Sequence, residues 1–390
     1  MEKKIKFYYS LATYINYGVI SILTTFYIPY LNQVVGLSLT EIGKVVSIGA
    51  LFAIFSQLIL VNKLSRSKNK KKFIIIHLVA VIFMIVLLMY ISKNSIYFFA
   101  ILYGLIIQTI GTVYEIYVEE LSVKQRMEYS QIRKWGSIGF GCIVILSGII
   151  ISKYGFRTVH LMGILMMIIV ILIITVKFKN LESRNKRNTT KLIDVLKNRN
   201  ALILGGINLL AIGTYNAIEF AYSAYLVEIV GNANLANSLY SKSIGMRVFI
   251  EFISFMFVGR IFRKGNYKKY LIIAFSIAAL RILLFSTAYV PLVILGDQLH
   301  GIMFACYLTF LFKYIREVVT DELVAGTFSF VSVLSSAGAS FIYPQMFSAI
   351  QEKFGYSLMY LVGLSIIVVA LLISIKILPE KKPKIKTSEI

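Results

Sequence analysis

Apolar stretches of about 20 residues recur along the whole chain, and they constrain its fold more than any other feature. A helix of that length crosses the roughly 30 Å hydrocarbon layer of a membrane. The stretches are too long for barrel strands and lack the alternation that such strands require. We therefore predict an all-α polytopic membrane protein with twelve transmembrane helices, over about residues 7–33, 41–62, 73–92, 95–119, 130–152, 157–178, 201–228, 237–262, 268–287, 290–315, 323–349 and 356–378.

Basic residues gather in alternate loops of this arrangement. About 31 Lys and Arg residues fall in the two terminal segments and the loops on their side, against about five in the opposite loops. Loops on the cytoplasmic side of a membrane carry such an excess. Both termini are therefore predicted to be cytoplasmic, in a multi-pass protein of the cell membrane. The basic residues of these loops account for the net charge of +23, so no nucleic-acid partner is expected.

One long polar loop, near residues 177–199, divides the spans into two groups of six. This division predicts four parts of the chain. They are an N-terminal six-helix bundle (1–178), a cytoplasmic linker (179–200), a C-terminal six-helix bundle (201–378) and a basic cytoplasmic tail (379–390).

Two short sequence matches relate the two groups of spans. Asn69-Lys-Lys-Lys and the segment before it align with Asn266-Tyr-Lys-Lys, and Lys153-Tyr-Gly155-Phe aligns with Lys353-Phe-Gly355-Tyr. The offsets are about 197 and 200 residues, which indicates duplication of a six-helix unit. In transporters built this way, the solute binds between the halves near the membrane midplane.

The first group of spans carries an acid and a base inside apolar sequence. Glu115 lies about six residues before a short polar loop and Arg133 about five residues after it, so the two side chains are expected at similar depth on adjacent helices. The pair can form a clamp for a polar solute, because arginine donates hydrogen bonds and a carboxylate accepts them. A purely structural ion pair is the alternative. Phe140, two turns deeper on the face of Arg133, is a candidate platform for a ring, or else a packing residue.

The second group of spans holds six ionisable side chains in apolar sequence. Such groups mark proton relays in transporters, because a charge in the membrane is costly and is kept for function. Local structural roles are the alternative, with Arg247 and Glu251 as an i,i+4 helix pair and His300 as a packing residue. The candidate proton-coupling residues are Glu219, Arg247, Glu251, Arg281, Asp297 and His300.

Motifs for enzymatic chemistry are absent from the sequence. It contains no Gly-rich phosphate loop, no zinc-protease motif and no nucleophile elbow. Cys142 and Cys306 lie far apart in apolar segments, without the spacing of metal ligands. We expect no enzyme activity, no bound metal and no cofactor, with energy supplied by a proton gradient.

The residues above give the chain a specific resemblance. It resembles the major facilitator superfamily, and within it the lactose permease branch of oligosaccharide:proton symporters and the phenylpropionate-permease-like group. Glu115 and Arg133 have the eighteen-residue separation of the permease's sugar-recognising acid and arginine, and Phe140 stands where that family stacks a tryptophan on the sugar. Arg281 and His300 match its ninth-helix arginine and tenth-helix histidine. The resemblance implies two pseudo-symmetric bundles and transport by alternating access.

Three positions depart from that family's pattern. Met303 stands where the permease has its proton-carrying glutamate, Asp297 where it has a lysine, and Asn62 where the superfamily's loop motif has an aspartate. The proton is therefore expected on Glu251, Asp297 or Glu219, and lactose itself is not implied.

A secondary active transporter is the function that these observations indicate. We expect it to import a small polar solute, a sugar or glycoside in the first place, by proton symport through alternating access. Two alternatives stay open, a proton-coupled exporter of drugs or metabolites and a transport-inactive membrane sensor or scaffold. The expected partners are the solute, protons and membrane lipids, and the chain is expected to be a monomer.

Overall fold

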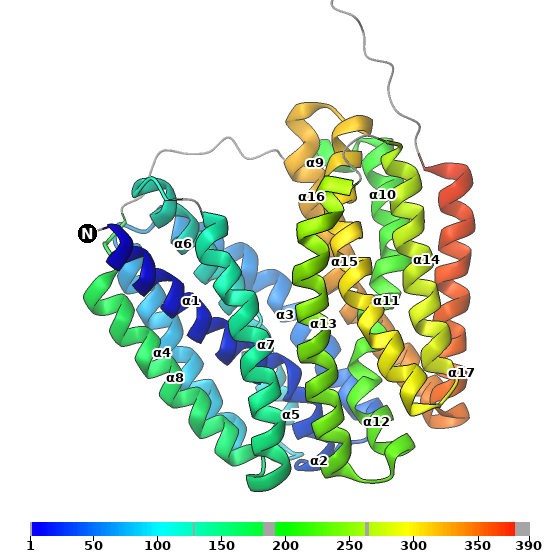
Figure 1. The fold of residues 1–390 in the computed structure, drawn as a ribbon, viewed down its shortest axis with the longest axis horizontal. Helices are drawn as coiled ribbons and strands as arrows, with labels where there is room; N and C mark the ends of the chain where they lie inside the picture. Colours follow the sequence, from blue (N-terminus) through cyan, green and yellow to red (C-terminus); the bar gives the residue numbers. More distant parts are fainter. Residues whose placement is uncertain (1, 128, 182–191, 262–264, 379–390) are drawn as a thin grey trace, which may run out of the picture.

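The structure, a computed structural model, describes residues 2–127, 129–181, 192–261 and 265–378. In these ranges the chain is helical and contains no strand, so the predicted all-helical fold is confirmed. The helices form two lobes that lie side by side (Figure 1). The first lobe holds α1 (Glu2–Thr25), α2 (Tyr27–Gln33), α3 (Leu39–Arg66), α4 (Lys70–Met89), α5 (Ile96–Ile106), α6 (Ile110–Lys124), α7 (Tyr129–Tyr154) and α8 (Phe156–Lys177).

The second lobe contains more and shorter elements. It holds α9 (Leu192–Leu196), α10 (Arg199–Asn208), η1 (Leu209–Gly213), α11 (Thr214–Ile218), η2 (Glu219–Ala221), α12 (Tyr222–Val230), α13 (Ala233–Ile261), α14 (Tyr267–Ser286), α15 (Val290–Val318), η3 (Asp321–Leu323), α16 (Val324–Val333), η4 (Leu334–Gly338) and α17 (Ala339–Ile377). Of these, η1 and η4 are π-helical and η2 and η3 are 3₁₀-helical. The predicted tail and residues 182–191 of the predicted linker lie outside the described residues.

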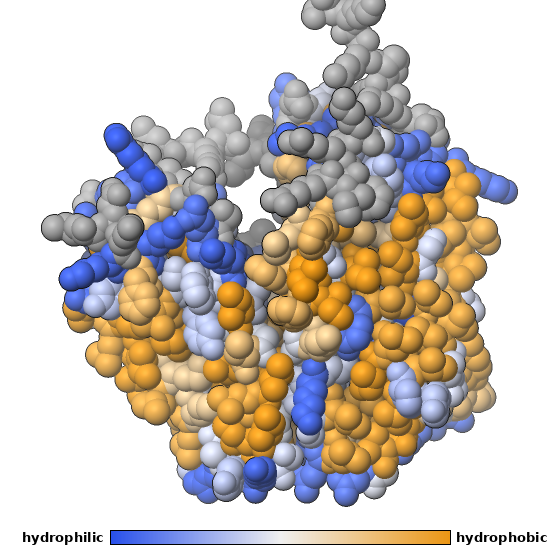
Figure 2. Space-filling view, in the orientation of Figure 1, coloured by the Kyte–Doolittle hydropathy of each residue, from blue (hydrophilic) through white to orange (hydrophobic). Residues whose placement is uncertain are grey.

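Length and hydropathy identify ten membrane-spanning segments in the described part of the chain. One of them, Gly326–Ile377, is 52 residues long and changes direction at Gly355, so it contains two spans. A further helix, α13, is 29 residues long and is not among the ten; it carries three charged residues, Lys242, Arg247 and Glu251, inside its apolar sequence. With these two corrections, the described helices account for the twelve predicted spans. Figure 2 shows hydrophobic residues over the middle of both lobes and hydrophilic residues at the two ends.

The two pairs of matching sequence segments also have similar local structures. The side-chain oxygen of Asn69 accepts a hydrogen bond from the backbone of Lys72 and so caps α4, and Asn266 caps α14 in the same way through Lys269. Gly155 and Gly355 both have φ of +79°, a left-handed conformation that glycine adopts without steric cost. Each of these glycines turns the chain between the last two spans of its lobe.

The seventh span is the most interrupted one, and its breaks position a charged residue. It runs through α10, the π-helix η1, α11, the 3₁₀ turn η2 and α12. Short π and 3₁₀ segments inside α-helices are frequent at functional sites, because they re-aim side chains. Here Glu219 opens η2, at the point where the span changes helix type.

The lobes are joined at one end and separate at the other (Figure 1). Gln33 and Asn237 exchange two hydrogen bonds of 2.9 and 2.8 Å between their side-chain amides. Tyr240 donates to the carbonyl of Thr25, and Thr40 donates to Glu352. All three contacts lie at the end where α2 is found. The N-terminal end of α1 and the C-terminal ends of α8 and α17 lie on the opposite side, where the lobes spread apart (Figure 1).

Small residues on α7 let this helix pack closely against both lobes. A Cβ atom at Gly139 would come within 2.1 Å of the carbonyl oxygen of Tyr14 on α1. On the other side of the interface, Gly148 lies against Ser241 of α13, where a Cβ atom would meet the hydroxyl at 1.9 Å. α7 therefore presents small residues to two different helices, α1 and α13, and both can approach it closely.

Candidate functional site

Glu115 and Arg133 meet in the first lobe, as their spacing predicts. Arg133 Nε on α7 donates to Glu115 Oε1 on α6 across 2.5 Å. The two side chains remain 37% and 35% exposed, so the pair is not sealed inside the lobe. A second donor, Arg133 Nη1, reaches Ser137 Oγ one turn along α7 at 3.4 Å. The pair therefore presents a positive and a negative group together at an accessible surface.

Tyr17 of α1 completes this pair from a third helix. Its hydroxyl donates to the same Glu115 oxygen that binds Arg133. Its ring lies beneath the arginine, with the guanidinium carbon 4.2 Å from the ring centroid. Gly136 makes room for this arrangement, since a Cβ atom there would meet the Tyr17 ring at 2.7 Å and Arg133 Nη1 at 3.1 Å. The sequence did not single out Tyr17, because it is one of 25 tyrosines.

A narrow crevice, too tight for a water molecule, lies beside the pair. Polar and aromatic groups dominate its walls, contributed by α1, α6 and α7. The lining residues are Thr13, Tyr17, Tyr114, Glu115, Val118, Tyr129 and Arg133. Phe140, the predicted ring platform, is not one of them; it is half-buried and packs against the hydrophobic core. The aromatic surfaces beside the pair are those of tyrosines.

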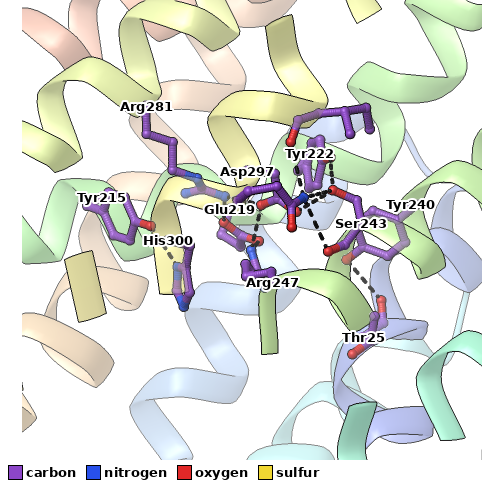
Figure 3. A network of polar contacts seen from close by, with 12 residues as sticks. Thr25, Tyr215, Glu219, Tyr222, Tyr240, Ser243, Arg247, Arg281, Asp297 and His300 are labelled. Atoms are coloured by element: carbon purple, nitrogen blue, oxygen red, sulfur yellow. Dashed lines mark hydrogen bonds and ion pairs between the residues drawn. The ribbon is translucent and has the colours of Figure 1, made fainter. Parts of the chain in front are cut away.

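Four charged side chains of the second lobe form one closed cluster (Figure 3). Arg247 of α13 donates to Glu219 at 2.5 Å and to Asp297 of α15 at 2.9 Å. Arg281 of α14 donates to the same two acids at 2.6 and 2.8 Å. Two arginines thus face two carboxylates, which makes the cluster electrically neutral when all four are charged. The i,i+4 pair of Arg247 with Glu251, which was the structural alternative, does not form, because Arg247 turns to these partners.

The members of this cluster differ in their access to solvent. Asp297 is fully buried, and its second oxygen accepts a 2.6 Å hydrogen bond from Ser243. Arg281 is also buried and lies 4.8 and 4.7 Å from the ring centres of Tyr215 and Phe285. Glu219 remains 26% exposed. It is therefore the member of the cluster that a solute or water reaches most readily.

His300 lies beside the cluster without joining its ion pairs. Its Nδ1 atom is 2.6 Å from the Tyr215 hydroxyl, and its ring stacks on Phe304 with centroids 5.7 Å apart. Tyr215 in turn lies against Arg281. The histidine thus connects to the arginines through a tyrosine, a link that sequence analysis missed.

Glu251 stands apart from every other acid in the two groups. It is partly buried and has no ion-pair or hydrogen-bond partner among the described residues. It follows Arg247 by four residues and so lies on the same face of α13, the face that is turned into the protein. Its backbone packs against Gly301 of α15, where a Cβ atom would come within 2.5 Å of the Glu251 nitrogen.

Comparison with known proteins identifies a family and a fold. The sequence profile of the MFS_1 like family matches residues 6–362. No curated protein matches the sequence. A crystal structure of the nucleoside transporter NupG is similar over 97% of this chain and 100% of that one, with 12% identity and a TM-score of 0.84.

Two further solved transporters share the architecture. A bacterial homologue of the human lysosomal transporter Spinster, in an inward-facing and occupied conformation, has 14% identity, covers 96% of both chains and gives a TM-score of 0.69. A POT family transporter in complex with 5-aminolevulinic acid has 12% identity, covers 95% of both chains and gives a TM-score of 0.72. At these identities the likeness concerns the fold alone.

Proposed function

This chain belongs to the MFS_1 like family and is a secondary transporter of the major facilitator type, and on that premise we propose that it carries a small hydroxylated solute together with a proton. The solute class is a sugar or glycoside. The membrane is the cell membrane, with both termini on the cytoplasmic side. The proposed transport direction is inward, down the proton gradient.

The observation that supports this solute class is the accessible Glu115–Arg133–Tyr17 group. A partly exposed ion pair contributes little to stability, because solvent screens its charges. Here both charges keep about a third of their surface open. A carboxylate accepts hydrogen bonds from hydroxyl groups, and a guanidinium donates to hydroxyl and ether oxygens in a fixed geometry. Adjacent hydroxyls of a sugar ring offer both kinds of partner.

The crevice beside Arg133 is too tight to enclose a solute, so the proposed solute binds against the Glu115–Arg133–Tyr17 group from the space between the lobes. The tyrosine rings beside the pair offer apolar surface for the carbon face of a ring. A nucleoside also presents a hydroxylated ring, and NupG is a nucleoside transporter, so nucleosides belong in the test.

The arrangement of the lobes suits alternating access. The lobes are joined through Gln33, Asn237 and Tyr240 at one end and spread apart at the other. With the termini cytoplasmic, the open end faces the cytoplasm. Rocking of one lobe against the other about the site is the motion expected of a duplicated transporter.

Ligand-induced thermal stabilisation in detergent tests this proposal. Purified wild type is screened against monosaccharides, disaccharides, methyl glycosides and nucleosides, beside Glu115→Gln and Arg133→Lys. A solute of the proposed class raises the unfolding temperature of wild type and leaves both variants unchanged. Glu228→Gln is the control, because Glu228 is an exposed carboxylate at the end of α12 and should respond like wild type.

Uptake into proteoliposomes tests the coupling. A solute that stabilises wild type should accumulate when an inward proton gradient is imposed and should stop accumulating when the gradient is collapsed. Accumulation driven equally well without a proton gradient contradicts symport. Stabilisation of the two variants to the same extent as wild type contradicts the site.

A further inference from the structure

The charges of the two groups described above do not balance. Seven charged side chains belong to these groups. Four are carboxylates, Glu115, Glu219, Glu251 and Asp297, and three are arginines, Arg133, Arg247 and Arg281. Six of them form arginine–carboxylate contacts, which leaves one negative charge over. This excess does not depend on which arginine binds which acid.

Glu251 is the carboxylate that carries this excess. Glu115 is bound by Arg133, while Glu219 and Asp297 are each bound by two arginines. Protonation of any of these three would release an arginine from its partner, and an unpaired buried charge is costly. Glu251 has no partner to release. It is therefore the acid on which a proton changes the net charge without breaking an ion pair.

The surroundings of Glu251 connect it to both charged groups. Arg247 lies one turn away on the same face of α13, and His300 is next to the Gly301 backbone that contacts it from α15. From the first lobe, α7, the helix that carries Arg133, packs against α13. The contacts of α7 with α13 run antiparallel, with Gly148 at Ser241 and Gly141 at Val248, so Glu251 is level with the part of α7 just beyond Arg133.

We propose that Glu251 is the residue that binds the coupling proton, and that one proton accompanies each neutral solute. The inference rests on the proposed function. When the lobes spread apart, the Glu251 carboxylate exchanges a proton with water in the space between them. When the lobes close over the solute, water leaves and a lone carboxylate is strongly disfavoured. Closure over the solute therefore requires the neutral acid, and the proton returns to water on the other side when the lobes reopen. The empty carrier keeps water around Glu251 and returns with the carboxylate ionised, so one proton moves per cycle.

Glu251→Gln separates coupling from solute movement. The amide resembles the protonated acid, so the variant should complete the solute-loaded transition at any pH. We expect it to exchange labelled solute across the membrane within about threefold of the wild-type rate while losing accumulation driven by a proton gradient. Glu228→Gln should keep both activities. Labelled sugar from the stabilisation screen is the probe.

A second measurement works without any solute. Infrared difference spectra of the purified protein between alkaline and acidic buffer should show a protonated carboxyl band that is missing in Glu251→Gln and present in Glu228→Gln. A variant that still accumulates sugar against its gradient, or that keeps the band, overturns the assignment to Glu251. A wild type that shows the band but neither exchange nor accumulation leaves the proton site standing and counts against the proposed solute instead. A stoichiometry of one proton per sugar, read from the membrane potential that balances uptake, supports the count of charges, and a stoichiometry of two contradicts it.

Discussion

Arg133 lies across the ring of Tyr17, with its guanidinium carbon 4.2 Å from the ring centroid, while the hydroxyl of that ring donates to the acid that Arg133 binds. One tyrosine from α1 thus holds an ion pair formed by α6 and α7. Contacts of this kind fix the direction of a long arginine side chain before a ligand arrives, which lowers the entropic cost of binding.

Tyr17→Phe keeps the ring under Arg133 and removes only the hydrogen bond to Glu115. Since hydrogen bonds to charged groups contribute about 1.5–3 kcal/mol, we expect solute affinity to fall roughly tenfold or more, with little change in expression. Calorimetric titration with the stabilising solute measures this. Tyr27→Phe is the matched control, because the Tyr27 hydroxyl is buried without a hydrogen-bond partner among the described residues. Equal affinities of the Tyr17 variant and wild type would speak against a role in binding.

Gly136→Ala places a methyl group against Tyr17 and Arg133. We expect the tyrosine ring to be displaced and solute binding to weaken, while the protein still folds. Gly139→Ala is expected to be more damaging to stability, because its methyl group would meet the backbone of Tyr14 at 2.1 Å and force α1 and α7 apart. Gly206→Ala, with nothing within 4 Å, is the control. Thermal unfolding and solute binding are measured for all three. An unaltered unfolding temperature for the Gly139 variant contradicts the crossing geometry.

The Gln33–Asn237 pair holds the lobes together at one end. Removing either amide should destabilise the closed form of this end by about 1 kcal/mol. The fraction of molecules in which this end is open should then rise roughly fivefold. A cysteine at Ser241, which is fully buried against Gly148, reports on this opening. The rate at which this introduced cysteine is alkylated is measured in a background in which the exposed Cys142 is replaced by serine.

Gln33→Ala and Asn237→Ala should each speed that alkylation, and the double variant should add little, because the two hydrogen bonds are lost together. Gln345→Ala is the amide control, since Gln345 is exposed and its side chain bonds only within its own helix. Alkylation as slow in the two variants as in the control would show that the pair does not hold the lobes.

Asp297 and Glu251 should respond in opposite ways to loss of charge. Asp297→Asn leaves Arg247 and Arg281 short of a buried counter-charge, and breaking a buried pair in this way costs about 3–5 kcal/mol. Glu251→Gln removes a lone charge and should leave the unfolding temperature unchanged or raise it. Thermal unfolding at neutral pH distinguishes the two. An equal loss of stability in both variants would contradict the assignment of Asp297 as a paired acid and Glu251 as an unpaired one.

Neighbours within one hairpin were predictable from the sequence. Eighteen residues with one short loop bring Glu115 and Arg133 to the same depth on adjacent helices, and the structure joins them at 2.5 Å. The repeated Asn69 and Asn266 caps were likewise visible as sequence matches. In both cases helix geometry fixes the result, because the rise per residue and the loop length leave few alternatives.

The sequence by itself determined the apolar spans, their number and the charges that lie inside them, since the length and hydropathy of each stretch are local properties. Only the tertiary structure decided which charges meet. Arg247 is four residues from Glu251 and yet binds Glu219 and Asp297, 28 and 50 positions away in the chain. Tyr17 reaches Glu115 from 98 positions away. Such pairs depend on which faces of distant helices pack together, and no local rule of spacing specifies that.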